Sequence, residues 1–357
     1  MPASYLLADS TGHYLRADGA PNRRVGDDGL WQPVDEAARR YRNVGHPECV
    51  IAAAADVRVA PGPTRAPSAY LAELRATGLT ILDNVLDAAE ISTVRDQVDA
   101  QRSLQQPRHL DGRDDGRVML TESLSWSLEL ARAAVHPVAH WIFEAFLESR
   151  ELHFCHYPSV TIMRPASDVA GTYPAHGWHS DYPYHPGLFP DEHWPAAPAF
   201  GVQFNLCIDA FRPDNAATQY LPGSHLRRHW PPPEFSADGT RMGQGQHERV
   251  TQMVAPAGAA LIYDARLWHR ACDELNTSGE DRLAMLNAVA PAWVPLLAHK
   301  TAGNRAYLAS AVPDQLTARE RADVERLCVA PVAARPQGMP ALVNPRLEAE
   351  EAEGLGG

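Results

Sequence analysis

Residues 177–185 read Gly-Trp-His-Ser-Asp-Tyr-Pro-Tyr-His, and the fold and function predicted for the chain depend on this stretch. His179 and Asp181 are two residues apart, so on an extended segment their side chains project from the same face. An imidazole and a carboxylate at this spacing can bind one metal ion. With one further His they form the two-His, one-carboxylate set that suits non-haem Fe(II). A His-x-Asp pair alone is a weak signal among sixteen His residues, and it more often has no metal.

His269 is the candidate for the second His. It follows an apolar run, Ala259–Tyr263, and a turn, and Arg282 opens the next predicted strand thirteen residues later. A guanidinium can hold a carboxylate through two charge-assisted hydrogen bonds, so Arg282 is suited to an anionic co-ligand of the metal. By itself His269 would more often be a packed core residue. Its order after His179 and Asp181, with an Arg following, favours a metal site.

Composition narrows the class of protein. The 357 residues are 45% hydrophobic, which is ordinary for a globular protein with a substantial core. The net charge of −12 and the pI near 5.7 argue against nucleic acid or an anionic membrane as the main partner. The five scattered cysteines indicate reduced thiols, and no export signal or membrane span is evident, so we expect a cytoplasmic protein.

Strand and helix signals divide the chain. Residues 199–211 alternate, with Phe204 and its neighbours on an apolar face and Gln203 and Asn205 on a polar face. In a closed or sandwiched β-structure the polar face would line a cavity, although it could simply meet water. Asp87 followed by Glu90 predicts a capping box and a helix. Further helices are predicted through Leu71 and Leu74, over 128–147 with a break at His136-Pro137, and over 314–329; further strands are predicted over 79–82, 153–163 and 282–291.

The remaining stretches read as loops, a linker and a tail. Residues 101–121 are polar and predict a loop, and the Pro- and Gly-rich residues 229–249 predict a long excursion that could serve as a lid or substrate loop. Pro61-Gly62-Pro63 predicts a linker after an N-terminal extension. The alternatives for this extension are a lid, a dimer contact and a layer that wraps the domain, of which the last is favoured. The Glu-rich residues 348–357 predict a disordered tail.

The sequence resembles the phytanoyl-CoA dioxygenase family of Fe(II)- and 2-oxoglutarate-dependent oxygenases over roughly residues 70–295. The resemblance rests on several motifs in the right order: the opening that ends in residues 78–86, Trp178-His179-Ser180-Asp181-Tyr182-Pro183, the central segment 217–225, and Leu267-Trp268-His269 followed by Arg282. Ala216 stands where the family often has Gly. The gap from His269 to Arg282 is longer than usual and points to an insertion at 276–279. Arg266 and Arg270 are rivals of Arg282 for the carboxylate.

This resemblance implies a mainly β fold with flanking helices, a double-stranded β-helix (jelly roll, cupin-like). It implies that His179, Asp181 and His269 bind iron and that Arg282 anchors 2-oxoglutarate. Thr218, Gln203 and Asn205 are weaker candidates for the co-substrate cavity, and His225 is taken as a turn-stabilising residue. The implied domains are an N-terminal extension (1–67), the oxygenase domain (68–300) and a C-terminal helix with an acidic tail (301–357).

The implied reaction couples oxidative decarboxylation of 2-oxoglutarate by O2 to oxidation of an unactivated C–H bond of a small organic molecule. An Asp at position 181, where related halogenases have a small residue, favours hydroxylation. Aromatic residues near the motif suit a ring-containing substrate but are also ordinary core: Trp178, Tyr182, Tyr184, Trp194 and Phe204. The Ala, Arg and Pro bias is typical of high-GC bacterial genomes and favours a natural-product intermediate. Two alternatives remain: a zinc-dependent hydrolase with the same three ligands, and a non-catalytic β-barrel binding module.

Overall fold

The computed structural model describes most of the chain from residue 63 to residue 329 and a set of short N-terminal strands. The described residues are 4–8, 14–15, 21–22, 30–43, 47, 50–52, 57–61, 63–105, 117–169, 177–184, 194–232, 249–272 and 276–329. The tail at 348–357 and most of the excursion at 229–249 lie outside them. None of the described helices combines the length and the apolar character needed to cross a bilayer.

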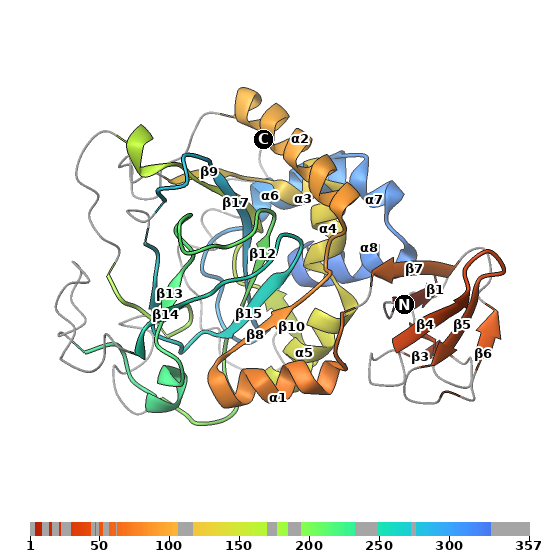
Figure 1. Cartoon of the computed structure of the whole chain (residues 1–357), viewed down its shortest axis with the longest axis horizontal. Helices are drawn as coiled ribbons and strands as arrows, with labels where there is room; N and C mark the ends of the chain where they lie inside the picture. Colours follow the sequence, from red (N-terminus) through yellow and green to blue (C-terminus); the bar gives the residue numbers. More distant parts are fainter. Residues whose placement is uncertain are drawn as a thin grey trace, which may run out of the picture.

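Two antiparallel sheets build the jelly roll (Figure 1). The main sheet has the order β8-β15-β12-β17-β11-β9, with β10 also paired to β17. Its strands are β8 (Leu79–Leu82), β15 (Ala260–Asp264), β12 (Val202–Cys207), β17 (Arg282–Pro291), β11 (Ser159–Met163), β9 (Arg117–Leu120) and β10 (Leu152–Phe154). The small sheet comprises β14 (Thr251–Gln252), β13 (Gln219–Tyr220) and β16 (His269–Arg270). The predicted jelly-roll fold is therefore confirmed.

The helices pack mainly on the face of the main sheet that is turned away from the cavity described below, and the one that contains Ala302 and Gly303 also lines that cavity. They are α1 (Pro67–Thr77), α2 (Ala88–Leu104), α3 (Ser123–Trp126), α4 (Leu128–Ala134), α5 (Pro137–Leu147), α6 (Thr301–Ala309), α7 (Val312–Gln315) and α8 (Ala318–Val324), followed by the π-helical turn η7 (Glu325–Val329). Two short 3-10 turns are η3 (Ala166–Asp168) and η4 (Ser224–Arg227). Phe204 of β12 lies in the main hydrophobic core with Phe143 of α5, their ring centroids 5.8 Å apart. Tyr307 and Leu327 join the same core, so the helices after residue 300 pack with the sheet.

Local chemistry explains several element boundaries. Asp87 accepts hydrogen bonds from the backbone amides of Ala89 and Glu90, and the Glu90 carboxylate accepts one from the Asp87 amide, which completes the predicted capping box of α2. α1 ends at Gly78, whose φ of 84° is left-handed. A Cβ on Gly78 would lie 2.5 Å from Nδ1 of His225. His225 thus joins η4 to the end of α1.

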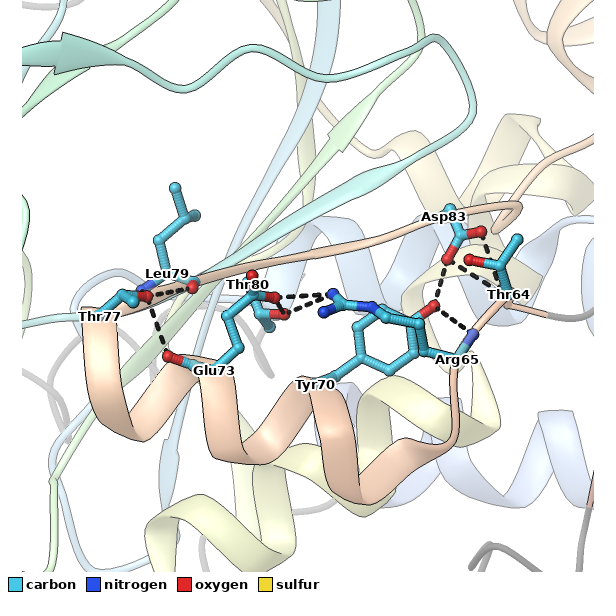
Figure 2. A network of polar contacts seen from close by, with 8 residues as sticks. All are labelled: Thr64, Arg65, Tyr70, Glu73, Thr77, Leu79, Thr80 and Asp83. Carbon is cyan, nitrogen blue, oxygen red and sulfur yellow. Dashed lines mark hydrogen bonds and ion pairs between the residues drawn. The ribbon is translucent and has the colours of Figure 1, made fainter. Parts of the chain in front are cut away.

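α1 and β8 are tied by a network of side chains (Figure 2). The Arg65 guanidinium lies 4.2 Å from the centroid of the Tyr70 ring and donates to the Glu73 carboxylate at 2.7 Å. Glu73 also accepts a hydrogen bond from the Thr80 hydroxyl on β8 at 2.6 Å. The Tyr70 hydroxyl donates to Asp83 at the end of β8. These contacts fix α1 against β8, which pairs with β15 and so supports the strand that precedes His269.

The structure departs from the sequence predictions in two stretches. Residues 101–121 were expected to form a loop, but α2 continues to Leu104 and β9 forms at Arg117–Leu120. Four residues at a sheet edge give too little alternation to be recognised, and their pairing with β11 decides their conformation.

Within the described residues of the N-terminal extension, seven strands form an antiparallel sheet of their own (red to orange in Figure 1). They are β1 (Ser4–Ala8), β2 (Tyr14–Leu15), β3 (Pro21–Asn22), β4 (Leu30–Asp35), β5 (Arg40–Asn43), β6 (Val50–Ala52) and β7 (Val57–Pro61). The proposed division of the chain near residues 67 and 300 stays a prediction.

Candidate active site

The structure brings His179, Asp181 and His269 together, although ninety residues separate the two imidazoles. One potential ligand atom from each lies within 4.8 Å of the other two. The His179 amide donates to the His269 carbonyl and the His269 amide to the His179 carbonyl, both at 3.0 Å, so the two residues sit directly opposite each other as a hydrogen-bonded antiparallel pair. The Asp181 amide donates to the Ala265 carbonyl at 2.7 Å, which ties Asp181 to the turn that precedes His269.

The backbone fixes the tautomer of both imidazoles. Nδ1 of His179 lies 2.9 Å from the Gly177 carbonyl oxygen, and Nδ1 of His269 lies 2.9 Å from the Leu267 carbonyl oxygen. A carbonyl only accepts, so each Nδ1 carries a proton, and in the neutral ring each Nε2 keeps its lone pair for a metal. Nε2 of His269 is 3.2 Å from Oδ2 of Asp181, and Nε2 of His179 is 3.7 Å from Oδ1. Hydrogen bonds from Nδ1 to a backbone carbonyl, like the two found here, orient metal-binding His residues in other proteins.

Asp181 is held as a carboxylate. Burial by itself would raise its pKa, but the adjacent imidazole of His269, then His179, and the Tyr263 hydroxyl outweigh burial and lower the pKa below its usual range. Burial likewise acts to lower the pKa of His269, and the Asp181 charge reverses the direction and raises it. The Tyr263 hydroxyl donates to Oδ2 of Asp181 at 3.1 Å and accepts from Nδ2 of Asn205 at 3.2 Å. The Asp181 carboxylate and the Nε2 atoms of His179 and His269 therefore face the same point.

A cavity of about 740 Å³ opens beside these three residues, within the range of small-molecule sites. Arg282, Thr218, Gln203 and Asn205 all line it. The polar face predicted for residues 199–211 thus does meet a cavity. The Arg282 side chain is buried, with its guanidinium carbon 3.8 Å from the centroid of the Phe211 ring, a cation–π contact that holds it flat.

The two rival arginines have other partners. Arg266 donates to both carboxylate oxygens of Asp264 and to the carbonyls of Pro195 and Ala196, which stiffens the turn before His269. Arg270 donates through Nε to the Gln219 side chain in the small sheet at 2.7 Å. Neither lines the cavity among the described residues, so Arg282 is left as the candidate anion anchor.

The two departures from the family pattern, Ala216 and the insertion at 276–279, both lie in turns. Ala216 adopts a left-handed φ of 61°, the conformation that a Gly would adopt without steric strain. The inserted segment forms a turn in which the buried Asn276 donates to the carbonyls of Met163 and Glu280 at 3.1 and 3.0 Å. That turn joins the end of β11 to the start of β17, next to Arg282.

Most of the aromatic residues noted in the sequence belong to the core. Trp178 packs with Trp268, Tyr184 packs with Trp194, and Phe204 lies in the main core; of the five only Tyr182 lines the cavity. The cavity instead contains residues that the sequence did not single out: Glu122, His156, Tyr157, Phe211 and Tyr263. Alternation along β15 could have indicated Tyr263, which faces opposite to Ile262.

A jelly roll whose paired strands present two His and one carboxylate beside a cavity is the arrangement of cupin-like metal oxygenases. The sequence model of the phytanoyl-CoA dioxygenase family matches residues 74–284, more than half of the chain. The chain belongs to this family.

Curated relatives match over shorter stretches. "Dioxygenase cdmD" from Talaromyces verruculosus is 34% identical over 103 residues, 29% of this chain and 30% of that protein. "Uncharacterized protein Rv1501" from Mycobacterium tuberculosis is 34% identical over 84 residues, 24% of this chain and 26% of that protein. The matched stretch therefore spans less than a third of the length of either relative.

Solved structures resemble the chain at low identity. The non-heme alpha ketoglutarate dependent epimerase SnoN from nogalamycin biosynthesis is 19% identical, with a TM-score of 0.48, over 63% of this chain and 83% of that one. HygX from Streptomyces hygroscopicus, with nickel, 2-oxoglutarate and hygromycin B bound, is 14% identical, with a TM-score of 0.48, over 64% of this chain and 88% of that one.

Proposed function

We propose that the protein is an Fe(II)- and 2-oxoglutarate-dependent dioxygenase that hydroxylates an unactivated C–H bond of a small organic molecule, a natural-product intermediate. The observation that carries this proposal is the convergence of two Nε2 lone pairs and an ionised carboxylate beside a cavity, with each Nδ1 tied to a carbonyl. His179, Asp181 and His269 are the proposed iron ligands. When bound, the iron would couple reduction of O2 to oxidative decarboxylation of 2-oxoglutarate and to oxidation of the substrate.

The donor set fits this metal. Two imidazoles and one carboxylate leave open positions for a chelating 2-oxo acid and O2. A structural zinc site usually has four protein ligands, and among the described residues only these three His, Cys, Asp or Glu side chains form such a cluster.

The chain's own residues would position the co-substrate. Arg282 can receive the distal carboxylate of 2-oxoglutarate through two parallel N–H donors, and Phe211 restricts the plane of its guanidinium. The Thr218 hydroxyl and the amides of Gln203 and Asn205 are proposed as further polar contacts in the same cavity. Tyr263 would keep Asp181 oriented toward the metal.

The test is anaerobic titration of the metal-free protein with Fe(II) and then 2-oxoglutarate, monitored by the visible charge-transfer band of the chelate. Wild type should develop the band. Arg282→Ala should need about a hundredfold more 2-oxoglutarate, because two hydrogen bonds to a charged group are lost. Arg270→Ala is the matched control and should titrate like wild type, since its guanidinium contacts Gln219 outside the cavity.

Two outcomes would contradict the proposal. A protein that shows no band but binds zinc tightly, with no response to Arg282→Ala, would be assigned to the zinc-dependent hydrolases. In a hydroxylation assay Asp181→Ala should abolish product, and product formation at the wild-type rate would remove Asp181 from the ligand set.

A further inference from the structure

The cavity is elongated and its two ends differ in charge. Alternate residues of β17 face it, from Arg282 at one end to Ala288 at the other, a distance of about 20 Å along the strand. Met163 pairs with both Arg282 and Arg117, so two guanidinium groups lie at the first end. Ala288 is opposite Gln203, which is opposite Tyr263, the partner of Asp181. Asn205, which bonds the same Tyr263 hydroxyl, is opposite Leu286, so the iron-ligand candidates lie part-way along the cavity, between its two ends.

The second end contains what we call the distal subsite, formed by Glu122, His156, Tyr157, Tyr182, Ala302 and Gly303. One wall of this subsite consists of the small residues Ala302 and Gly303 of α6, which allow the helix to lie close to the cavity. A Cβ on Gly303 would lie 2.4–2.6 Å from atoms of the Tyr157 ring, so only Gly allows α6 to approach that ring. Leu297 also lines the cavity and is 45% exposed, which places an opening to solvent on this side.

His156 presents a hydrogen-bond acceptor to the distal subsite. Its Nδ1 lies 2.9 Å from the Tyr157 carbonyl oxygen and therefore carries the proton. Burial lowers the pKa of His156, against the opposing effects of that carbonyl and of Asp181, so the ring is neutral at pH 7. Among the described residues, the bond from Nδ1 is the one hydrogen bond of the His156 ring, and Nε2 makes none. Its lone pair is available to a ligand.

Glu122 supplies a second acceptor, which is charged. Ser123, the next residue, donates through Oγ to the Pro158 carbonyl at 2.6 Å, so Glu122 lies at the same end of the cavity as His156 and Tyr157. With the part of the chain that the structure describes, its carboxylate makes no hydrogen bond or ion pair, although it lines the cavity. The Glu122 backbone is left-handed, with φ 62°, where Gly would be unstrained. A strained residue that keeps an uncompensated carboxylate in a cavity indicates a role for that carboxylate.

We propose that the distal subsite binds the prime substrate through Glu122 and His156, and that this substrate is a cyclic molecule bearing hydrogen-bond donors, with a protonated amine against Glu122. The proposal rests on the proposed oxygenase function, which places 2-oxoglutarate at the Arg282 end. Two arginines at that end and a carboxylate at the other favour a cation in the distal subsite. The rings of Tyr157 and Tyr182 suit an apolar ring body.

The test compares three cyclohexane probes that differ in one group: cyclohexylmethylamine, cyclohexylmethanol and cyclohexanecarboxylate. Binding to the full-length protein loaded with Ni(II) and 2-oxoglutarate is measured by ligand-observed NMR titration. The amine should bind most tightly, the alcohol more weakly and the carboxylate least. Glu122→Gln should weaken amine binding about tenfold through loss of a hydrogen bond to a charged group, and should leave alcohol binding unchanged. His156→Leu should weaken the amine and the alcohol alike.

Two further variants separate this role from structural effects. Glu122→Gly should lose amine binding as Glu122→Gln does, yet melt at a higher temperature because the left-handed backbone is relieved. Glu148→Gln is the matched control: Glu148 is an exposed glutamate with a left-handed φ of 52°, away from the cavity, and its loss should change no probe's binding.

The proposal is overturned if the carboxylate probe binds best, if amine and alcohol bind equally, if the amine does not bind, or if Glu122→Gln binds the amine like wild type. The same samples report Ni(II) and 2-oxoglutarate binding. If neither Ni(II) nor 2-oxoglutarate binds, the oxygenase function is contradicted instead. The relative affinities of the three probes can still be measured on the metal-free protein.

Discussion

Tyr263→Phe is the sharpest test of how the proposed metal site is held. The variant removes one hydroxyl that donates to Oδ2 of Asp181 at 3.1 Å and accepts from Asn205 at 3.2 Å. The ring itself remains, with its edge contact to the His269 ring at a centroid distance of 5.1 Å. The change therefore isolates the support of the carboxylate from the packing of the strand.

The expected loss follows from the hydrogen bond to a charged oxygen. Such a bond contributes about 1.5–3 kcal/mol, which corresponds to roughly 10- to 100-fold in an equilibrium constant. Tyr263 also bonds the carboxylate when no metal is bound, so part of this energy cancels between the two states. We expect Fe(II) or Ni(II) affinity to fall about tenfold, at the lower end of the effects seen for residues that support metal ligands.

The assay is isothermal titration calorimetry with Ni(II), followed by the anaerobic Fe(II) and 2-oxoglutarate titration. Tyr182→Phe is the matched control, because Tyr182 lines the same cavity but its hydroxyl donates to the Pro295 carbonyl, at 2.5 Å. It should bind metal like wild type. Equal metal affinity in the two variants would refute the reasoning that Tyr263 supports Asp181.

Three predictions concern stability. Gly78→Ala should destabilise the protein by about 3 kcal/mol in urea unfolding, because φ is 84° and the new Cβ would lie 2.5 Å from His225 and 2.8 Å from Leu267; an unchanged midpoint would contradict this. Glu148→Gly should raise the free energy of unfolding by about 1 kcal/mol, since the exposed residue ends α5 in a left-handed conformation, and a lower melting temperature would argue against it. Burial lowers the pKa of His140 from 6.5 to about 3. As the pH decreases from 6.5 toward 3, the unfolded chain therefore binds a proton that the folded protein does not bind. The free energy of unfolding should fall over this range by at most about 1.4 kcal/mol per pH unit. His140→Phe should flatten that pH dependence, and an identical slope would exclude His140 as its source.

Elements whose signals are local could be predicted from the amino-acid sequence. The capping box at Asp87, the αL Gly78 that ends α1, the break at Pro137 and the alternation of residues 202–207 each depend on neighbours a few residues away. The order of His179, Asp181, His269 and Arg282 also identified the family, because only a few strand positions in a jelly roll converge on one point. These predictions needed no knowledge of tertiary contacts.

Long-range contacts determine which side chains share the cavity, and these contacts cannot be read from neighbouring residues. Glu122 and His156 come from different segments of the chain, and nothing within a few residues of either distinguishes it from a surface or core residue. β9 forms because β11 offers an edge to pair with, a contact between residues about forty positions apart. The two imidazoles meet because the His179 and His269 backbones pair across ninety residues. Local residue types set the available chemistry, and long-range strand pairing decided which groups stand together to perform it.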